Sequence, residues 1–196
     1  MKKFGVIVGL ITVAVVYFFV LHMNRVPTYD ENVKESWSQV QNQYKRRADL
    51  IPNLVSTVKG YAAHEKEVFT EVTKARSKVG QLTVTPEVLN DPNAFAAFEK
   101  AQDALSSALN KLMMVSERYP DLKADKNFLA LQTQLEGTEN RISVARRDYI
   151  AAVKVYNVEL RTIPGRWVAA FLYPDAEVKQ TFSASPAEQS TPEVKF

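Results

Sequence analysis

Two arginine-rich segments carry the side chains best suited to chemistry. The first contains Arg46, Arg47 and Asp49, and the second contains Arg146 and Arg147. A guanidinium group presents a planar fork of N–H donors that fits a carboxylate or a phosphate through two parallel hydrogen bonds. Each segment can therefore pair with acidic side chains of another helix or bind an anion.

The sequence leaves both interpretations of these five residues open. If the segments lie on neighbouring antiparallel helices, an arginine from each can pair with a carboxylate of the other and fix the register of the helices. Glu136 and Glu139 precede the second segment on the same expected helix and supply such carboxylates. Alternatively, the four arginines form an anion site for lipid headgroups, phosphate or an acidic partner surface.

Other candidate catalytic groups lack the partners that their chemistry requires. His64 belongs to neither an HExxH nor an ExxH sequence, and di-iron bundle proteins need the latter on two helices. Ser56 and Lys59 have the SxxK spacing of some serine acyl-enzymes, but no SDN or KTG segment accompanies them. The absence of cysteine excludes thiolate metal sites and a cysteine nucleophile. We therefore predict no metal, no cofactor and no enzyme activity.

The charge distribution argues against nucleic acid as a partner. The chain has 25 lysines and arginines against 22 acidic residues. The excess of three equals Lys2, Lys3 and Arg25, which flank an apolar N-terminal segment. The remainder is charge-balanced and shows no interleaving of basic and aromatic residues, so it lacks the electrostatic pattern of a nucleic-acid interface.

Residues 1–25 are predicted to be a signal anchor that crosses a membrane. The run from Phe4 to Met23 contains no charged residue, and about 20 helical residues span a hydrocarbon core of about 30 Å. The LHMNRVPTYDE segment that follows lacks a small-x-small cleavage site, which favours an anchor over a cleaved signal peptide. Lys2 and Lys3 favour a cytoplasmic N-terminus, with the rest of the chain in the periplasm or outside a bacterial inner membrane.

Residues 26–182 are predicted to form an all-α domain, because apolar residues recur at helical spacing. The first periodic element runs from Tyr29 to Val79 and ends at Gly80. Its apolar stripe keeps phase across Pro52, which favours a kinked helix or two nearly collinear helices over a reversal. Asn53 is expected to hydrogen-bond a backbone carbonyl that the proline leaves without a donor.

Capping residues place the later helices. Asp91, followed by proline, starts a helix that Pro120 stops, and a second long helix starts near Asp125 and ends at Pro164. The short apolar segment Arg166–Tyr173 is expected to pack over one end of the bundle. The aromatic residues of the stripes are predicted to be core residues, namely Trp37, Tyr44, Tyr61, Tyr149 and Tyr156.

The predicted fold is an antiparallel bundle of long helices, similar to a four-helix bundle, behind one transmembrane helix. The first long helix is kinked near Pro52. Residues 183–196 are small, polar and proline-containing, and are expected to be a disordered tail.

Four segments resemble the LemA family of bacterial membrane-anchored helical proteins. They are KRRADLIPNLV at Lys45–Val55, TVKGYAAHE at Thr57–Glu65, YPDLKADKNFLALQTQLEGTENRISVARRDY at Tyr119–Tyr149, and VYNVELRTIP at Val155–Pro164. The resemblance extends over most of Tyr29–Tyr173. It implies a bundle of long helices behind one membrane span and no defined biochemical activity.

The sequence therefore predicts a single-pass, membrane-anchored scaffold or interaction protein of the bacterial envelope. Its expected partner is another protein or a second copy of the chain, with anionic lipid as a further candidate. The alternative is an anionic-ligand or lipid receptor, or an enzyme, whose site lies near Pro52 among the arginines. A receptor or enzyme needs a concave pocket with convergent polar groups, whereas a scaffold needs a filled core and an exposed surface patch.

Overall fold

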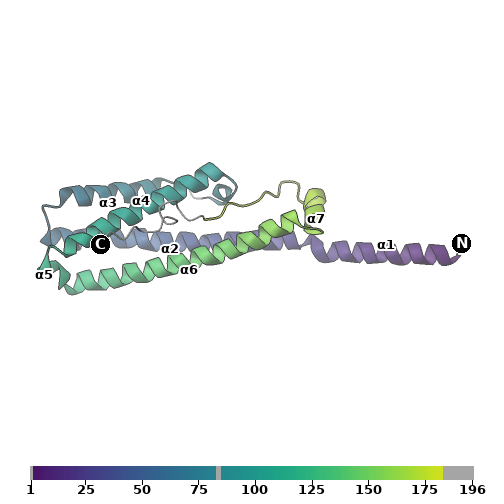
Figure 1. Cartoon of the computed structure of the whole chain (residues 1–196), viewed down its shortest axis with the longest axis horizontal. Coiled ribbons are helices and arrows are strands. Elements are labelled where there is room, and N and C mark those ends of the chain that lie inside the picture. Colours follow the sequence, from purple (N-terminus) through teal and green to yellow (C-terminus); the bar gives the residue numbers. More distant parts are fainter. Residues whose placement is uncertain (1, 83–84, 183–196) are drawn as a thin grey trace, which may run out of the picture.

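The computed structural model describes residues 2–82 and 85–182, and this part of the chain is helical with no strand (Figure 1). The elements are α1 Lys2–Met23, α2 Arg25–Tyr61, α3 Lys66–Gln81, the 3₁₀ helix η1 Pro86–Leu89, α4 Pro92–Ser116, α5 Pro120–Lys123, α6 Lys126–Arg161 and α7 Gly165–Leu172. The all-α prediction is confirmed. The tail expected at 183–196 lies outside the described residues.

Four helices, α2, α3, α4 and α6, alternate in direction and form the predicted bundle (Figure 1). Helix α2 packs mainly against α6, and α3 packs mainly against α4. Helix α1 continues beyond the bundle in roughly the direction of α2 (Figure 1). The short helix α7 covers the end of the bundle next to α1, as expected for the apolar segment that contains it.

The buried side chains form two clusters along the bundle axis. The proximal core, nearer α1, contains Val26, Val33, Trp37, Val40, Tyr44, Leu89, Phe95, Phe98, Ile142, Ala145, Tyr149, Val153, Tyr156, Ala169 and Phe182. The distal core contains Ile51, Leu54, Val58, Ala62, Phe69, Val72, Leu105, Ala108, Leu109, Leu112, Val115, Leu122, Phe128 and Leu135. Both cores include residues of α2, α4 and α6, whereas α3 contributes buried residues to the distal core alone.

The chain reverses after Tyr61, so the expectation of one element that continues to Gly80 was wrong. Helix α2 passes through Pro52 without reversal, as predicted. The reversal occurs in residues 62–65, where Ala62 is 1% exposed and its N–H donates to the Val58 carbonyl (2.9 Å). Glu65 then accepts from Arg118 (3.1 Å) and from the Tyr119 hydroxyl (3.2 Å). These distant partners fix the turn, and the local apolar pattern does not reveal them.

The predicted helix starts are confirmed by their capping bonds. The Asp91 carboxylate accepts from the N–H groups of Asn93 (2.8 Å) and Ala94 (3.2 Å). The Asp125 carboxylate accepts from the N–H of Phe128 (2.8 Å), and this bond lowers the pKa of Asp125. Such bonds satisfy backbone donors that the first turn of a helix leaves without partners.

One residue, Asn24, separates α1 from α2. Its carbonyl accepts from the Thr28 hydroxyl (2.7 Å), and the neighbouring Met23 carbonyl accepts from the Tyr173 hydroxyl (2.9 Å). The helical stretch Gly9–Tyr61 includes one window, near the N-terminus, that is long and apolar enough to cross a membrane. That window has a mean hydropathy of 1.6, and 11% of it is buried inside the protein.

Candidate functional site

Arg47 is the centre of a polar layer between the proximal and distal cores. Its side chain is 1% exposed. One terminal nitrogen donates to the Ser106 hydroxyl (2.8 Å) and to the Glu139 carboxylate (3.0 Å). The other donates to the Gln102 side-chain oxygen (2.6 Å) and lies 3.3 Å from the Gln102 carbonyl. Arg47 therefore connects α2 to α4 and α6 at one level of the bundle.

The helical spacing of α2 explains why this arginine is buried. Arg47 follows Tyr44 by three residues and precedes Ile51 by four, so it occupies an inward-facing position of the apolar stripe. A buried guanidinium is tolerated when its donors are paired. Its Nε is the one nitrogen without an acceptor. Glu139 keeps 43% of its side chain exposed, so this carboxylate remains partly hydrated while it pairs with Arg47.

The other four residues of the predicted cluster lie in different surroundings. Arg46 and Asp49 are exposed on α2. The Arg146 guanidinium lies 4.3 Å from the centre of the Phe182 ring. Arg147 pairs with Asp148 of its own helix (3.1 Å) and is 74% exposed. Because Arg47 is buried with its terminal nitrogens occupied, the four arginines do not form one open anion site.

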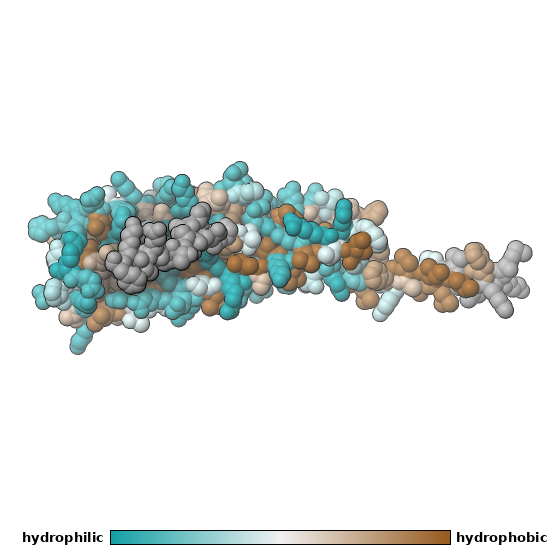
Figure 2. All heavy atoms as spheres, in the orientation of Figure 1, coloured by the Kyte–Doolittle hydropathy of each residue, from teal (hydrophilic) through white to brown (hydrophobic). Residues whose placement is uncertain are grey.

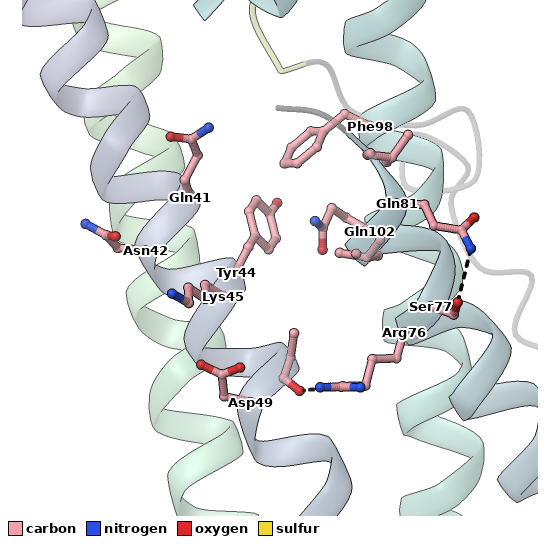
Figure 3. Close-up of a pocket in the computed structure, with 14 residues that line it drawn as sticks. Gln41, Asn42, Tyr44, Lys45, Asp49, Arg76, Ser77, Gln81, Phe98 and Gln102 are labelled. Carbon is pink, nitrogen blue, oxygen red and sulfur yellow. Dashed lines mark hydrogen bonds between the residues drawn. The ribbon is translucent and has the colours of Figure 1, made fainter. Parts of the chain in front are cut away.

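A cavity of about 670 Å³ lies beside the polar layer, between α2, α4 and the end of α3 (Figure 3). Its wall combines aromatic, amide and charged side chains, and Gln102 belongs both to the wall and to the Arg47 layer. The lining residues are Gln41, Asn42, Tyr44, Lys45, Ala48, Asp49, Arg76, Ser77, Val79, Gly80, Gln81, Leu82, Phe98 and Gln102. The cavity therefore lies one helical turn before Pro52.

Pro52 and Arg76 together shape this wall. A proline inside a helix lacks the N–H that would bind the carbonyl four residues earlier, which here belongs to Ala48. Arg76 of α3 supplies the missing donor, because its Nε donates to the Ala48 carbonyl at 3.0 Å (Figure 3). The expectation that Asn53 would satisfy such a carbonyl was wrong, since this role falls to Arg76. The contact attaches α3 to α2 at the edge of the cavity.

The cavity has the groups needed for binding by charge and hydrogen bonds. Lys45 and Arg76 are its cations and Asp49 is its carboxylate. Its described lining contains no histidine, and its hydroxyl groups belong to Tyr44 and Ser77. Among the described residues, no group of three histidine, cysteine, aspartate or glutamate side chains could hold a metal ion. His64 lies exposed in the turn after α2, away from the cavity lining.

Sequence reasoning missed the segment that completes the proximal core, residues 174–182, here called the strap. The Asn157 amide donates to the Lys179 carbonyl and accepts from the Lys179 N–H, both at 2.9 Å. The Tyr149 hydroxyl donates to the Gln180 carbonyl, and the Gln180 N–H donates to the Leu89 carbonyl, both at 2.7 Å. The strap is therefore held through its backbone by α6 and by the end of η1.

Side chains of the strap also bind the bundle. Phe182 is 8% exposed, and its ring lies 5.1 Å from that of Phe95 and 5.6 Å from that of Tyr149. The Lys179 ammonium lies 3.0 Å from the Asp30 carboxylate. Burial acts to raise the pKa of Asp30, but hydrogen bonds from lysines outweigh it and lower that pKa. The isolated apolar Phe182 is the one local signal of the strap in the sequence.

The tyrosines of the apolar stripes divide into two groups. Tyr44, Tyr149 and Tyr156 are buried as predicted, and burial raises the pKa of each, to about 12 for Tyr156. Tyr61 is 44% exposed instead, and its hydroxyl donates to the Asp125 carboxylate (3.0 Å). The chain reversal after Tyr61 removes it from the core.

Comparison with known families identifies the bundle. The family model described as "LemA family" matches residues 36–196. The chain belongs to the LemA family. The matched range includes the Arg47 layer, the cavity and the strap, so these features lie within the LemA domain. Helix α1 lies before it.

Curated relatives of this LemA-family chain include proteins with two kinds of name. Magnetosome protein MamQ 2 of Paramagnetospirillum magneticum is 28% identical over 180 residues, which cover 84% of this chain and 66% of that protein. Protein LemA of Metamycoplasma hominis is 26% identical over 189 residues, which cover 96% of this chain and 81% of that protein. The chain therefore spans slightly less than two thirds of the magnetosome protein and most of the mycoplasma protein.

Proposed function

We propose that this LemA-family chain is a single-pass membrane protein that acts by binding, with another protein or a second copy of itself as its partner. The observation that carries the proposal is the position of α1 outside the bundle. Its described apolar side chains stay exposed, including Leu10 (66%), Val13 (67%) and Tyr17 (64%). Figure 2 shows a narrow, largely hydrophobic extension that projects beyond the more hydrophilic surface of the bundle. The hydrocarbon core of a bilayer accommodates apolar side chains of this kind, whereas in water they would form a large exposed hydrophobic surface.

The flanking charges support one orientation. Lys2 and Lys3 begin α1, and Arg25 and, farther along, Lys34 follow it. The positive charge directly beside the apolar segment is therefore slightly greater at its N-terminal end, which supports a cytoplasmic N-terminus. The bundle then faces the periplasm or the exterior, and its partners belong to the envelope.

Two observations support binding over catalysis. The described part of the cavity wall offers amides, two hydroxyl groups, two cations and one carboxylate, and no histidine lies among these groups to act as a base. The curated relatives are named for the magnetosome or as LemA, and neither name denotes a reaction. Arg47 and the strap rigidify the bundle, which suits a surface that presents a fixed shape to a partner.

Two measurements on cells test the anchor and its side. After alkaline carbonate extraction, the full chain is expected to stay with the membrane pellet, because α1 spans the bilayer. Protease added to intact spheroplasts is expected to remove the bundle while a cytoplasmic control protein survives. Release by carbonate would contradict the anchor. A bundle that resists protease until lysis would show that the proposed orientation is wrong.

The second candidate function is a receptor for a small anion, and the cavity beside the Arg47 layer favours it. Lys45 and Arg76 supply positive charge there, and a volume of about 670 Å³ is in the range of ligand pockets. Asp49 in the same wall suits a ligand that also carries a donor group. This version of the anion hypothesis uses Lys45 and Arg76 in place of the four arginines.

Calorimetry with inorganic phosphate and with glycerol phosphate tests the receptor. Binding to the full chain in detergent is expected, and Lys45→Gln should weaken it because one of the two cations is removed. Lys154→Gln is the matched control, since Lys154 is exposed on α6 and lies outside the cavity. Equal binding by both variants, or no binding by the unmodified chain, would refute the receptor.

A further inference from the structure

Helix α7 occupies the junction between α1 and the bundle. It contacts α1, α2 and α6, and it lies across the direction of α1 (Figure 1). Directly after it, the Tyr173 hydroxyl donates to the carbonyl of Met23, the last residue of α1 (2.9 Å). A helix that crosses the end of a transmembrane segment lies parallel to the membrane surface and close to it.

The two faces of α7 differ strongly. Gly165, Val168 and Ala169 face the bundle, and a Cβ at Gly165 would clash with the Glu159 carbonyl, so this face is held tightly. The opposite face exposes large apolar side chains. These are Trp167 (51%) and Phe171 (80%), and the exposed Ile163 (62%) precedes the helix.

The exposed face has the composition of a membrane-interface helix. Trp167 and Phe171 are four residues apart, so their side chains lie on one side of the helix. Tryptophan is enriched at the level of lipid headgroups because its ring is apolar and its N–H is polar. Arg161 and Arg166, both exposed, add positive charge beside the same face, and Asp175 lies beyond its other end. Figure 2 shows apolar residues gathered at this end of the bundle.

We propose that α7 is a second membrane contact, which inserts Trp167 and Phe171 into the headgroup region of the bilayer that α1 crosses. The partner of this surface is the lipid bilayer, because the surface is continuous with the exposed apolar surface of α1. The inference rests on the proposed membrane anchor. It adds that the bundle lies directly on the membrane, since α1 and α7 would contact the bilayer at two places.

Tryptophan fluorescence provides a direct test, because the chain has two tryptophans and the other, Trp37, is 1% exposed in the proximal core. The full chain is reconstituted into vesicles of phosphatidylcholine with a minority of phosphatidylglycerol. The spectrum of Trp167→Phe, subtracted from that of the unmodified chain, gives the signal of Trp167 without altering Trp37. Circular dichroism checks that both proteins are equally helical.

Three results are expected, two for Trp167 and one for Trp37. Lipids brominated near the headgroup should quench it more strongly than lipids brominated near the acyl terminus. Aqueous iodide should quench it weakly. In Trp167→Phe, the remaining Trp37 signal should respond little to either bromolipid, because that ring is enclosed by the bundle.

Carbonate extraction of the same vesicles separates failure of α7 docking from failure of the anchor. If the chain stays with the vesicles but Trp167 is quenched by iodide and not by bromolipid, the α7 proposal is wrong and the anchor stands. If Trp167 is shielded from both quenchers in a manner that depends on protein concentration, a second copy covers α7 and the proposal is again wrong. If carbonate releases the chain, the anchor fails and the α7 proposal fails with it.

Discussion

The proximal and distal cores fill the two ends of the bundle in different ways. Leucine, isoleucine and valine dominate the distal core, which the four helices α2, α3, α4 and α6 surround. The proximal core is built around aromatic rings, with Trp37 in contact with Phe95, Phe98, Tyr149 and Phe182 at centroid distances of 5.2–6.2 Å. There η1 and the strap contribute residues where α3 contributes none that is buried.

The difference shows how a bundle remains filled where one helix is too short. Helical side chains form regular ridges that pack into the grooves of another helix, but an extended segment offers no such ridges. Large rings that meet edge to face fill the irregular space instead. Polar contacts to the strap backbone, from Asn157 and Tyr149, then fix the segment in place.

Arg47→Ala should have the largest effect on stability, because Arg47 is the centre of the polar layer between the two cores. The substitution leaves a space in the interior and deprives the buried Gln102 amide of its donor. The expected loss is about 2–5 kcal/mol of unfolding free energy. Denaturant unfolding of the full chain in detergent, followed by circular dichroism, measures it.

Two further variants sharpen this result. Arg46→Ala with Arg147→Ala removes two exposed arginines and should change stability by no more than about 0.5 kcal/mol for each site. Arg47→Met keeps most of the volume without the charge, and should retain more stability than Arg47→Ala. An equal loss for the exposed pair and for Arg47→Ala would contradict the central role of the buried arginine.

Phe182→Ala should detach the strap and affect the proximal core alone. The ring is 8% exposed among three other aromatic residues. The expected loss is about 3 kcal/mol of unfolding free energy. This is the lower end for a buried phenylalanine, because the whole strap can detach and leave the helices folded. Near-ultraviolet circular dichroism should weaken, and the Gln180 amide should exchange faster. Val178→Ala, at a position 38% exposed on the same strap, should leave both signals unchanged.

Asn157→Ala should loosen the strap without disturbing the rings directly. It removes both 2.9 Å hydrogen bonds to the Lys179 backbone, and the expected cost is about 1–2 kcal/mol. Hydrogen exchange at Lys179 and Gln180 reports it. Asn140→Ala, at an exposed position of α6, is the control. If the Lys179 and Gln180 amides exchange at the same rate in both variants, the two Asn157 hydrogen bonds do not hold the strap.

Acidification should produce the smallest effect, through Asp30. Hydrogen bonds from Lys34 and Lys179 outweigh burial and lower the pKa of Asp30 below its ordinary value of 3.8. The resulting stabilisation is complete above that ordinary value and is lost as the pH falls through the lowered pKa. The change should stay under about 1 kcal/mol. Hydrogen exchange of the strap amides, measured against pH, should show this loss of stability. Asp30→Asn should abolish the pH dependence. If the variant keeps the same pH profile, a group other than Asp30 titrates.

The sequence predicted the helical parts of the fold because their signals are local. Asp91 and Asp125 are capping residues, and the apolar spacing of α2 and α6 extends over many turns. The reversal after Tyr61 has no proline, and its Glu65 is held by Arg118 and Tyr119, which come more than 50 residues later. A turn fixed by distant partners leaves little trace in the local pattern.

The Arg47 layer and the cavity were also predictable from the sequence only in part. Arg47 occupies the helical position between Tyr44 and Ile51, where the apolar stripe of α2 is interrupted by a polar residue. Its partners Gln102 and Ser106 belong to another helix, so the spacing of residues along α2 does not reveal them. The bond from Arg76 to the Ala48 carbonyl depends on α3 folding back toward Pro52, and the local sequence pattern does not predict that reversal.

In the proposed membrane arrangement, the single residue between α1 and α2 couples the tilt of the anchor to the tilt of the bundle. Helix α2 has 37 residues, which corresponds to a length of about 55 Å. The hydrogen bond from the Tyr173 hydroxyl to the Met23 carbonyl connects the bundle to the end of α1. If α1 and α2 tilt together by about 10°, the far end of α2 moves by about 10 Å. Changes in bilayer thickness that tilt the anchor would therefore move the turn at residues 62–65 through the surrounding space, far from any lipid.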